Sequence, residues 1–496
     1  MTDIPFIMLD DKNSDVPLYR QIYEAMRRAI LNGEFESGKR LPATRLLATQ
    51  LGVSRTTVIN AYEQLFAEGY LEGKTGAGTF VAACLPEDFL QTPRVERREN
   101  KAEILSRKLN FSDFGKNISK ESLEILHSHQ PSSYVPFRHG QPAIDKFPFD
   151  VWTKIANKCY YSPRREMFGY GEPAGFRPLR EAVASHLKSA RGVNCTPEQV
   201  IITNGAQQAF DLIGRIFLEP KTEVWIENPC HQGARTSFQS FGAKLTPVAV
   251  DKDGFDLAAA LKQSKNARLV YVTPSHQFPL GLTMSLQRRL SLIEWARAND
   301  SWIVEDDYDS EYRYAGRPLA SLQGLDRNGR VIYIGTFSKT IFPALRLGCL
   351  VVPPDLIEIF TAVRALGGAH SPLVDQAILA EFIAEGHFAR HVRRMRTLYQ
   401  ERQQVLVEES KRQFGGLLEV SAADAGMHVI GWLPENVSDK SVGEKAALAG
   451  LSVAPVSGYS FHPPTRNGLM LGYTAFTEKQ IKEGVRKLAR ILREIV

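Results

Sequence analysis

Short apolar runs alternate with helical stretches throughout residues 136–496. Each run is three or four residues long and is separated from the next by enough chain for a helix. The runs are Val200-Ile202, Val224-Ile226, Leu269-Val272, Trp302-Val304, Val331-Ile334 and Leu350-Val352. This alternation predicts an α/β fold with a mainly parallel sheet. From about residue 375 a long helical stretch is followed by mixed segments, which predicts a smaller second subdomain.

Length and composition allow more than one domain and exclude several kinds of protein. A chain of 496 residues is expected to hold two or three domains. With 43% hydrophobic and 23% charged residues, its composition is that of a soluble globular protein. Asp3 and Asp10 interrupt any secretory leader and no apolar run is long enough to cross a membrane, so we expect a cytoplasmic protein. The 5 cysteines form no CxxC pair, which argues against a disulfide framework or a metal cluster.

Three helices are predicted in the N-terminal segment, residues 16–82. Apolar residues recur at helical spacing from Leu18 to Ile30. A second helix over residues 45–51 is expected to begin with Thr44 as its cap, and a third helix is expected to begin with Ser54 as its cap. The last two helices are short and closely joined, as in a helix-turn-helix.

A β-hairpin is expected after the third helix. Residues 70–81 place strand-like side chains on either side of a glycine-rich tip that contains Gly76. The hairpin would be the wing of a winged helix-turn-helix. We therefore expect residues 1–82 to form an α+β domain of this kind.

Several side chains lie where such a domain contacts double-stranded DNA. The net charge of +6 is small for the chain's length, so the argument rests on position. Recognition helices read the major groove with their N-terminal residues. Four candidate contacts lie in that first turn: Ser54, Arg55, Thr56 and Thr57. Arg45 and Lys74 are candidates for phosphate contacts, with Gly76 at the tip of the wing. The alternative, a small helical bundle with incidental arginines, leaves the wing without an explanation.

This segment resembles the GntR family of winged helix-turn-helix repressors. The resemblance is contiguous and rests on Pro17-Leu18-Tyr19, Leu41-Pro42-Ala43-Thr44-Arg45, Leu51-Gly52-Val53-Ser54-Arg55-Thr56-Thr57-Val58 and Glu68-Gly69-Tyr70-Leu71. It implies a bacterial transcriptional regulator that binds operator DNA.

Residues 83–135 are expected to form a linker. Between residues 86 and 101, Pro, Glu, Asp and Arg are enriched and apolar residues are few. This composition favours exposed chain. His127 and His129 have no cysteine or acidic partner at ligand spacing, so we expect them in solvent and not on a metal.

A lysine, an aspartate and a tyrosine follow two neighbouring strand candidates. Lys339 lies in Thr336-Phe337-Ser338-Lys339-Thr340, directly after one apolar run, and Asp306 and Tyr308 follow another. Ligands of open α/β sheets bind at the carboxyl ends of the strands, so these side chains can meet there. An amine, a carboxylate and a phenol suit pyridoxal phosphate (PLP). Lys339 would form the Schiff base, and Asp306 would hold the pyridine nitrogen protonated.

A second set of residues would hold the cofactor's phosphate. Gly205, Ala206 and Gln207 follow a strand and open a helix, where backbone N–H groups attract phosphate. Arg346 lies seven residues after Lys339. Taken singly, each feature also fits an ordinary strand-helix turn, a helix cap or a surface residue. Their order and spacing together favour the cofactor site.

Residues 136–496 resemble the fold-type-I, aspartate-aminotransferase-like PLP enzymes. The resemblance rests on Phe168-Gly169-Tyr170-Gly171-Glu172-Pro173-Ala174-Gly175, Thr203-Asn204-Gly205-Ala206-Gln207-Gln208 and Leu345-Arg346-Leu347-Gly348. It implies that Asp306 pairs with the pyridine nitrogen, Tyr308 with the ring hydroxyl and Arg346 with the phosphate, and it adds Thr336 to the cofactor site. It also implies that Tyr170 reaches the phosphate of a neighbouring subunit, and hence a homodimer.

Three positions depart from the pattern of active aminotransferases. Met470 stands where an arginine usually binds the substrate α-carboxylate, a contact that a thioether cannot replace. His231 stands near the place of the ring-stacking aromatic and would stack on the cofactor instead. Phe278 replaces an asparagine. We expect at most residual half-transamination, unless Arg235 or Arg466 supplies the missing contact.

The whole chain resembles the MocR subfamily of GntR-type transcriptional regulators, in which a winged helix is fused to an aminotransferase-like domain. This resemblance implies a regulator that senses PLP, or an amine or amino-acid effector, through Lys339, and that controls genes of vitamin B6 or of amine and amino-acid metabolism. The absence of the carboxylate-binding arginine favours PLP itself, or an amine without an α-carboxylate. Two alternatives are an active aminotransferase with an appended DNA-binding domain and a DNA-binding protein whose PLP is structural. Activation and repression both stay open.

Overall fold

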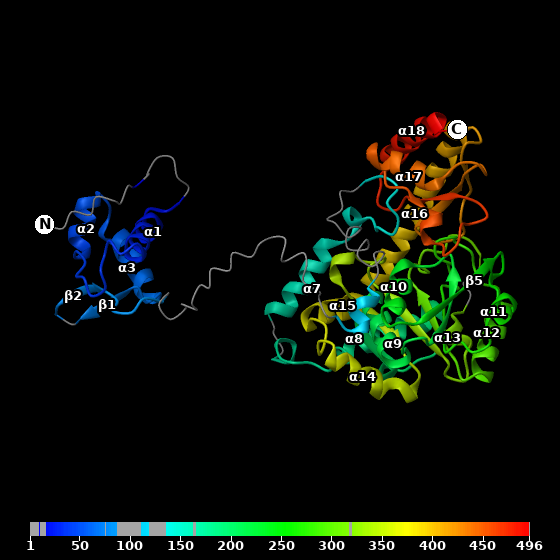
Figure 1. The fold of residues 1–496 in the computed structure, drawn as a ribbon, viewed down its shortest axis with the longest axis horizontal. Helices are drawn as coiled ribbons and strands as arrows, with labels where there is room; N and C mark the ends of the chain where they lie inside the picture. The colour runs from blue at the N-terminus through cyan, green and yellow to red at the C-terminus, as the bar shows by residue number, and fades with distance from the viewer. Residues whose placement is uncertain are drawn as a thin grey trace. The chain divides into compact units, whose positions relative to one another are not determined.

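The chain folds into two compact units, Met1–Leu109 (the head) and Asn110–Val496 (the body) (Figure 1). The computed structural model describes Leu9 and residues 16–74, 76–86, 111–118, 135–161, 165–316 and 320–495. His127, His129 and most of the expected linker therefore lie outside the described residues. Among the described helices, none combines the length and the apolar character that a membrane crossing requires.

The head is a winged helix-turn-helix, as predicted. Its elements are α1 (Leu18–Leu31), α2 (Thr44–Leu51), α3 (Arg55–Ala67), β1 (Leu71–Lys74) and β2 (Gly78–Val81). The two strands pair in antiparallel register to form the wing. The core lies between the three helices and contains Ile22, Met26, Leu47, Val58 and Leu65.

The two predicted helix caps have different outcomes. The Ser54 side chain accepts a hydrogen bond from the Thr57 backbone N–H, so this cap is confirmed. The expected cap at Thr44 is wrong, because the residue before α2 is Ala43 and no side chain caps this helix. The Ala43 backbone is already extended, so Thr44 becomes the first helical residue. The Tyr62 hydroxyl donates to the Pro42 carbonyl at 2.9 Å and holds α3 against the start of α2.

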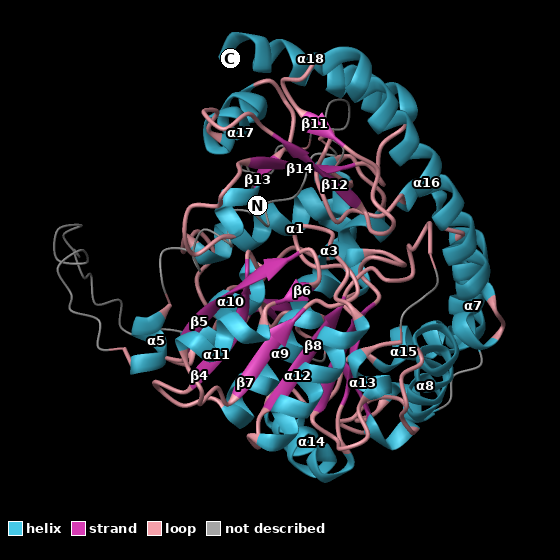
Figure 2. Cartoon of the chain, turned by 90° about the vertical axis from the view of Figure 1, so that its right-hand side faces the viewer, coloured by secondary structure: helices cyan, strands magenta, loops and turns pink. Residues whose placement is uncertain are grey.

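The body is built on an eight-stranded sheet in the order β3-β10-β9-β8-β7-β4-β5-β6 (Figure 2). The strands are β3 (Val200–Thr203), β4 (Glu223–Asn228), β5 (Lys244–Asp251), β6 (Gly254–Phe255), β7 (Leu269–Val272), β8 (Trp302–Asp307), β9 (Val331–Thr336) and β10 (Gly348–Val351). From β5 through β4, β7 and β8 to β9 every neighbouring pair is parallel. The strand β10 is antiparallel to both β9 and β3. All six predicted strands and the mainly parallel sheet are thus confirmed.

Helices cover both faces of this sheet, which is why its strands are apolar on both sides. Ile226, on one face, belongs to a core with α9 (Ala206–Phe217), α10 (Gln232–Ser240) and α14 (Ile357–Leu366). Trp225, on the other face, packs in a core with α12 (Leu286–Ala298) and α11 (Leu257–Gln263). Further along, Val200 shares a core with α7 (Phe149–Tyr161), α8 (Arg177–Arg191) and α15 (Leu373–Ala384).

The end of the chain forms the predicted smaller subdomain. A four-stranded sheet, β11-β12-β14-β13, packs against the long helix α16 and the C-terminal helix α18 around one apolar core. Its elements are α16 (His387–Phe414), β11 (Glu419–Val420), β12 (His428–Trp432), α17 (Asp439–Leu448), β13 (Ala454–Pro455), β14 (Gly468–Gly472) and α18 (Glu478–Ile495). The remaining short helices are α5 (Asp113–Asn117), α13 (Leu322–Leu325), and 3-10 turns at Ile144–Lys146, Arg165–Phe168, Pro197–Gln199, Pro343–Leu345, Pro354–Leu356 and Val456–Tyr459.

Candidate cofactor site and nucleic-acid interface

A cavity of about 880 Å³ opens at the carboxyl ends of the central strands of the body. Nine of the ten residues predicted for the cofactor site line it: Gly205, Ala206, Gln207, His231, Asp306, Tyr308, Thr336, Lys339 and Arg346. Seven of them lie at or near the end of β8, the end of β9 and the start of α9, which the fold brings to one edge of the sheet. His231 directly precedes α10, and Arg346 follows the 3-10 turn Pro343–Leu345. The volume is in the range of pockets that hold small molecules.

Lys339 is partly buried and lies three residues beyond the end of β9. Its Nζ donates to the Gly140 carbonyl at 3.0 Å. Burial lowers the pKa of this amine, and the carboxylates of Asp309 and Asp306 oppose that shift. A lowered pKa increases the fraction of neutral amine near pH 7, which is the form that attacks a carbonyl.

Asp306 lies near the end of β8 and is also buried. The Tyr271 hydroxyl donates to its carboxylate at 2.7 Å. Burial raises the pKa of Asp306 to about 7, and the hydrogen bond from Tyr271 opposes the shift. The protonated pyridine nitrogen of PLP, placed against the Asp306 carboxylate, would stabilise the charged form of that carboxylate. The carboxylate would in turn keep the pyridine nitrogen protonated.

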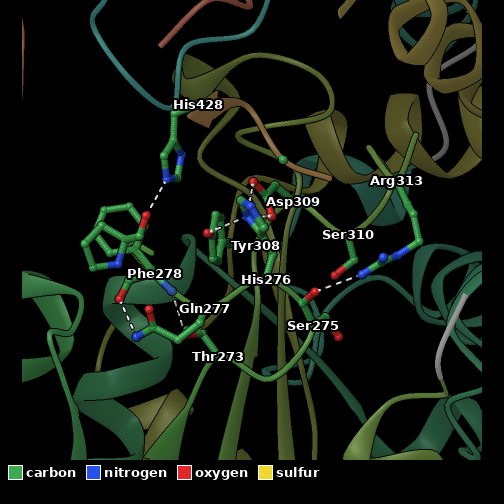
Figure 3. A network of polar contacts seen from close by, with 12 residues as sticks. Thr273, Ser275, His276, Gln277, Phe278, Tyr308, Asp309, Ser310, Arg313 and His428 are labelled. Carbon is green, nitrogen blue, oxygen red and sulfur yellow. Dashed lines mark hydrogen bonds and ion pairs between the residues drawn. The ribbon is translucent and has the colours of Figure 1, made fainter. Parts of the chain in front are cut away.

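Tyr308 takes part in a buried polar cluster with a histidine and a second aspartate (Figure 3). His276 Nδ1 lies 2.9 Å from the Tyr308 hydroxyl and 3.1 Å from both carboxylate oxygens of Asp309. Burial raises the pKa of Tyr308 well above its ordinary value, so its phenol stays protonated and can donate a hydrogen bond.

A buried ion pair holds the last residue of β8, Asp307, in place. Arg191 Nε lies 2.7 Å from the Asp307 carboxylate, to which the Tyr333 hydroxyl also donates at 2.7 Å. Arg191 also donates to Ser275 Oγ at 2.8 Å, which links this pair to the loop after β7. Asp307 therefore supports the strand, and its neighbours Asp306 and Tyr308 face the cavity.

The expected phosphate position has the chemistry of an anion site. Gly205 precedes α9 with φ 94°, a conformation that favours glycine, and no side chain caps the helix. Its first N–H groups therefore point towards the cavity with the positive end of the helix dipole. Arg346 donates to the Asn204 carbonyl at 2.9 Å, and a Cβ added at Gly205 would lie 3.4 Å from Arg346 Nη2. Glycine thus leaves room beside the guanidinium for a phosphate.

Other predicted residues lie elsewhere. Tyr170 is 97% exposed and its ring lies 6.4 Å from that of His370, so it does not line this cavity. Arg466 pairs with Glu419 at 2.7 Å, and Arg235 lies over the Phe461 ring at 4.2 Å. Neither arginine is among the described residues that line the cavity.

The place of the missing arginine is apolar. Met470 is fully buried in a cluster with Phe278, Ile430 and Val456. Phe278 faces the cavity and packs edge-on against His231, with ring centroids 5.4 Å apart. This wall offers van der Waals contact and no charge.

Sequence reasoning missed several lining residues because they lie far from the motifs along the chain. His139 and Gly140 come from the start of the body, and Met427 and His428 come from the small subdomain. The chain offers no spacing pattern that would connect them to Lys339, since the hydrogen bond from Lys339 to Gly140 spans 199 residues.

A short segment from the expected linker also reaches the cavity. Residues 111–118 contain α5, whose first turn is capped by Ser112. The Phe114 ring packs edge-on against that of Phe241 at 5.3 Å, and Phe114 and Ile118 line the cavity. Part of the chain that leads to the head thus contacts the site itself.

In the head, six of the seven predicted DNA contacts lie on exposed positions, and Thr57 is half-buried. Arg55 and Thr56 are exposed in the first turn of α3, beside the Ser54 cap. Arg45 is exposed on α2. Lys74 is exposed on the wing, 3.9 Å from the Glu72 carboxylate, and Gly76 at the tip has φ 77°. The arrangement leaves the start of α3 and the wing open to a ligand as large as a DNA duplex.

Comparison with known proteins finds a different family for the head and for the body. Residues 18–81 match the family of bacterial regulatory proteins, gntR family, and residues 133–488 match aminotransferase class I and II. The probable rhizopine catabolism regulatory protein MocR of Rhizobium meliloti is 41% identical, over 96% of this chain and 94% of that protein. The pyridoxine biosynthesis transcriptional regulator PdxR of Corynebacterium glutamicum is 30% identical, over 97% of each.

Among solved structures, the body resembles LysN, an α-aminoadipate aminotransferase of Thermus thermophilus that was crystallised with N-(5'-phosphopyridoxyl)-L-leucine. The TM-score is 0.70 with 28% identity, over 78% of this chain and 97% of that one. The body thus has the fold-type-I aminotransferase fold, and the head has the DNA-binding fold of the GntR family. The chain belongs to the MocR subfamily of GntR-type transcriptional regulators, in which a winged helix-turn-helix is joined to an aminotransferase-like domain.

Proposed function

We propose that this regulator binds PLP through Lys339 and that the occupancy of the body's cavity controls how the head binds operator DNA. The observation that carries the proposal is the meeting of nine separately predicted residues around one cavity, in a chain that also has a winged helix. The ligand must favour one arrangement of head and body over another for this control to work.

Several of the lining residues have distinct roles in binding the cofactor. When bound, PLP supplies an aldehyde that condenses with amines. Lys339 presents an amine whose pKa is lowered by burial, and the buried Asp306 carboxylate offers a counter-charge for a protonated ring nitrogen. Tyr308 donates from a protonated phenol, and the start of α9 with Arg346 attracts the phosphate.

The contact of residues 111–118 with the cavity supports the control of DNA binding. Phe114 and Ile118 line the wall and lie on the segment that continues towards the head. A ligand that changes this wall also changes how residues 111–118 are held. Ligand binding can then alter DNA binding by the head without a contact between head and ligand.

A homodimer is the proposed assembly. Tyr170 is 97% exposed, and Tyr161 and Phe168 nearby in the chain are 85% and 57% exposed. Large aromatic side chains of this kind are enriched in protein interfaces. Covering them with a second subunit would bring Tyr170 towards that subunit's phosphate position.

The effector and the target genes follow from the relatives only as a class. One relative is named for rhizopine catabolism and another for pyridoxine biosynthesis. We infer that this regulator responds to PLP or to an amine or amino acid, and that it acts on genes of vitamin B6 or of amine and amino-acid metabolism.

A second candidate function is aminotransferase activity, which the intact set of Lys339, Asp306 and Tyr308 favours. Against steady turnover stand the apolar wall at Phe278, with Met470 buried in the same cluster, and the absence of a cavity-lining arginine other than Arg346 among the described residues. We expect at most a half-reaction. Sustained conversion of an amino donor and a keto acid would instead support the enzyme.

The proposal is tested by a mobility shift of the DNA upstream of the protein's own gene, with PLP-free and PLP-loaded protein side by side. The expected result is a change in affinity, or in the mobility of the complex, when PLP is present. Equal binding in both forms, and no change on addition of amines, would contradict control through the cavity.

A further inference from the structure

Few charged side chains line the cavity, and most already have a partner. The cations are Lys339 and Arg346, and the carboxylates are Asp211, Asp306 and Asp309. Both cations have tasks towards PLP in the proposed function. Asp211 pairs with Arg215 at 2.8 Å, outside the cofactor set. Asp306 would face the ring nitrogen. Asp309, which contacts His276, is then the remaining carboxylate with no role in binding the cofactor.

Asp309 lines the same cavity as the Lys339 amine. Of the two carboxylates that oppose the lowering of the Lys339 pKa, Asp309 has the larger effect. Its side chain is 1% exposed, and its described partner is His276 Nδ1 at 3.1 Å. A buried carboxylate in the cavity that holds the lysine amine favours a second cation there.

Two histidines of the wall are neutral. Burial lowers the pKa of His139 to about 3 and that of His428 to about 4, so neither imidazole is charged near pH 7. His428 Nε2 lies 2.8 Å from the Pro279 carbonyl, which can only accept, so this nitrogen carries the proton and Nδ1 is an acceptor (Figure 3). Phe278 and Met427 complete the wall with apolar surface.

A carboxylate on the effector would therefore lack a lysine or arginine partner of its own in the described cavity. No guanidinium or ammonium lines the described cavity besides Lys339 and Arg346. An ionised carboxylate that leaves water without a hydrogen-bonding or charged partner loses several kcal/mol of solvation. An ammonium group, in contrast, meets Asp309, and hydroxyl groups meet neutral imidazoles that can accept or donate.

We propose that the cavity takes, beside the cofactor, a primary amine that carries no carboxylate. Asp309 holds its ammonium group, and the neutral wall around Phe278, His139 and His428 holds its apolar or hydroxylated body. This inference rests on the proposed function, because it places the effector in the same cavity as PLP.

The test compares amines with their carboxylated counterparts on PLP-loaded, full-length protein. Matched pairs are ethanolamine and serine, tyramine and tyrosine, and cadaverine and lysine. Binding is measured by the change in the absorption of the bound cofactor and, separately, by calorimetry. In at least one pair the amine is expected to bind at least about tenfold more tightly, since about 1.4 kcal/mol of unpaired charge already gives that ratio.

Two substitutions locate the selectivity. Asp309→Asn keeps the size of the side chain and removes its charge, and it should reduce the preference for the amine within the responding pair by about tenfold. Asp211→Asn is the matched control, because it removes a cavity-lining carboxylate that Arg215 already neutralises. It should leave the ratio unchanged. Thermal melting of each variant checks that the body remains folded, and the pair comparison on the wild-type protein stands whether or not Asp309→Asn folds.

The outcomes separate the inference from the proposed function. Equal or tighter binding of the carboxylated members overturns the inference alone. So does the lack of any response to amines in protein whose DNA binding responds to PLP. Protein that takes up no PLP removes the proposed function and this inference with it.

Discussion

At the scale of single residues, burial sets the chemistry of Lys339. Its amine lies 3.0 Å from the Gly140 carbonyl in a cavity with two nearby carboxylates. Lys339→Ala should abolish the absorption of lysine-bound PLP and leave folding intact, because a smaller side chain at a cavity wall removes little packing. Absorption spectra and circular dichroism check both parts. Lys188→Ala, an exposed lysine on α8, is the control, and an unchanged absorption of Lys339→Ala would rule out this lysine.

The raised pKa of Asp306 predicts a pH dependence of stability in PLP-free protein. Its pKa rises from 3.8 to about 7 on folding, so between these values the folded state holds the proton more tightly than the unfolded state. The contribution of this carboxyl to stability therefore falls as pH rises from about 4 to about 7, and levels off above, by at most about 4 kcal/mol. Glu227 and Glu305 also have pKa values raised to about 7 by burial and add to the trend.

Comparison with Asp306→Asn isolates this contribution. The amide stays neutral and can still accept a hydrogen bond from Tyr271. The stability of the variant relative to the wild type should therefore increase from pH 4 to pH 7, because only the wild type loses the contribution of the protonated carboxyl. Urea unfolding followed by tryptophan fluorescence measures it, since all 5 tryptophans lie in residues 136–496. A difference that is constant with pH would contradict the raised pKa.

The residues that carry local patterns were predictable, and those that meet them across the fold were not. Lys339, Asp306 and Gly205 follow strands, and the rule that strand ends gather at one edge of a sheet was enough to bring them together. Tyr271, which holds Asp306, sits inside an ordinary apolar strand and has no distinguishing neighbours. His428 begins the strand β12 of the small subdomain, and no local pattern in the sequence connects it to the cavity.

At the scale of elements, the first turn of α3 is the clearest unit in the head. The Ser54 cap orders it, and Arg55 extends from an exposed position. Arg55→Ala should weaken binding to the operator by about 1–3 kcal/mol, with a smaller loss on unrelated DNA, if this side chain reads a base. Arg28→Ala, exposed in the last turn of α1, is the matched control. A footprint and affinity unchanged by Arg55→Ala would remove this residue from the interface.

Strands were predicted best where both faces are buried. The six apolar runs all became strands of the large sheet, because helices cover both of its sides. The strand β5 was not predicted, since its buried and exposed residues alternate and Pro247 interrupts it. The small subdomain's strands were also missed: β11 and β13 have two residues each, and their pairing with β12 and β14 depends on contacts between distant segments.

At the scale of the whole molecule, the control of DNA binding requires a physical link between cavity and head. The described part of the chain offers one in residues 111–118, which belong to the body and continue towards the head. Coupling between two ligands of one protein is reciprocal, so DNA must alter the affinity for PLP by the same factor by which PLP alters the affinity for DNA. This reciprocity allows the link to be tested from both sides.

Phe114→Ala removes the ring that packs against Phe241 and lines the cavity. We expect the factor by which PLP changes DNA affinity to be several-fold smaller in this variant, because residues 111–118 lose a ring contact with the cavity wall. The coupling free energy between two sites is typically about 1–3 kcal/mol. Phe111→Ala is the matched control, since Phe111 lies in the same segment, is 53% exposed and does not line the cavity. Mobility shifts with and without PLP, and PLP titrations with and without operator DNA, should give the same reduced factor for Phe114→Ala. If both variants keep the wild-type factor in both directions, the link runs through another part of the chain, and the cavity's contact with residues 111–118 only closes the pocket.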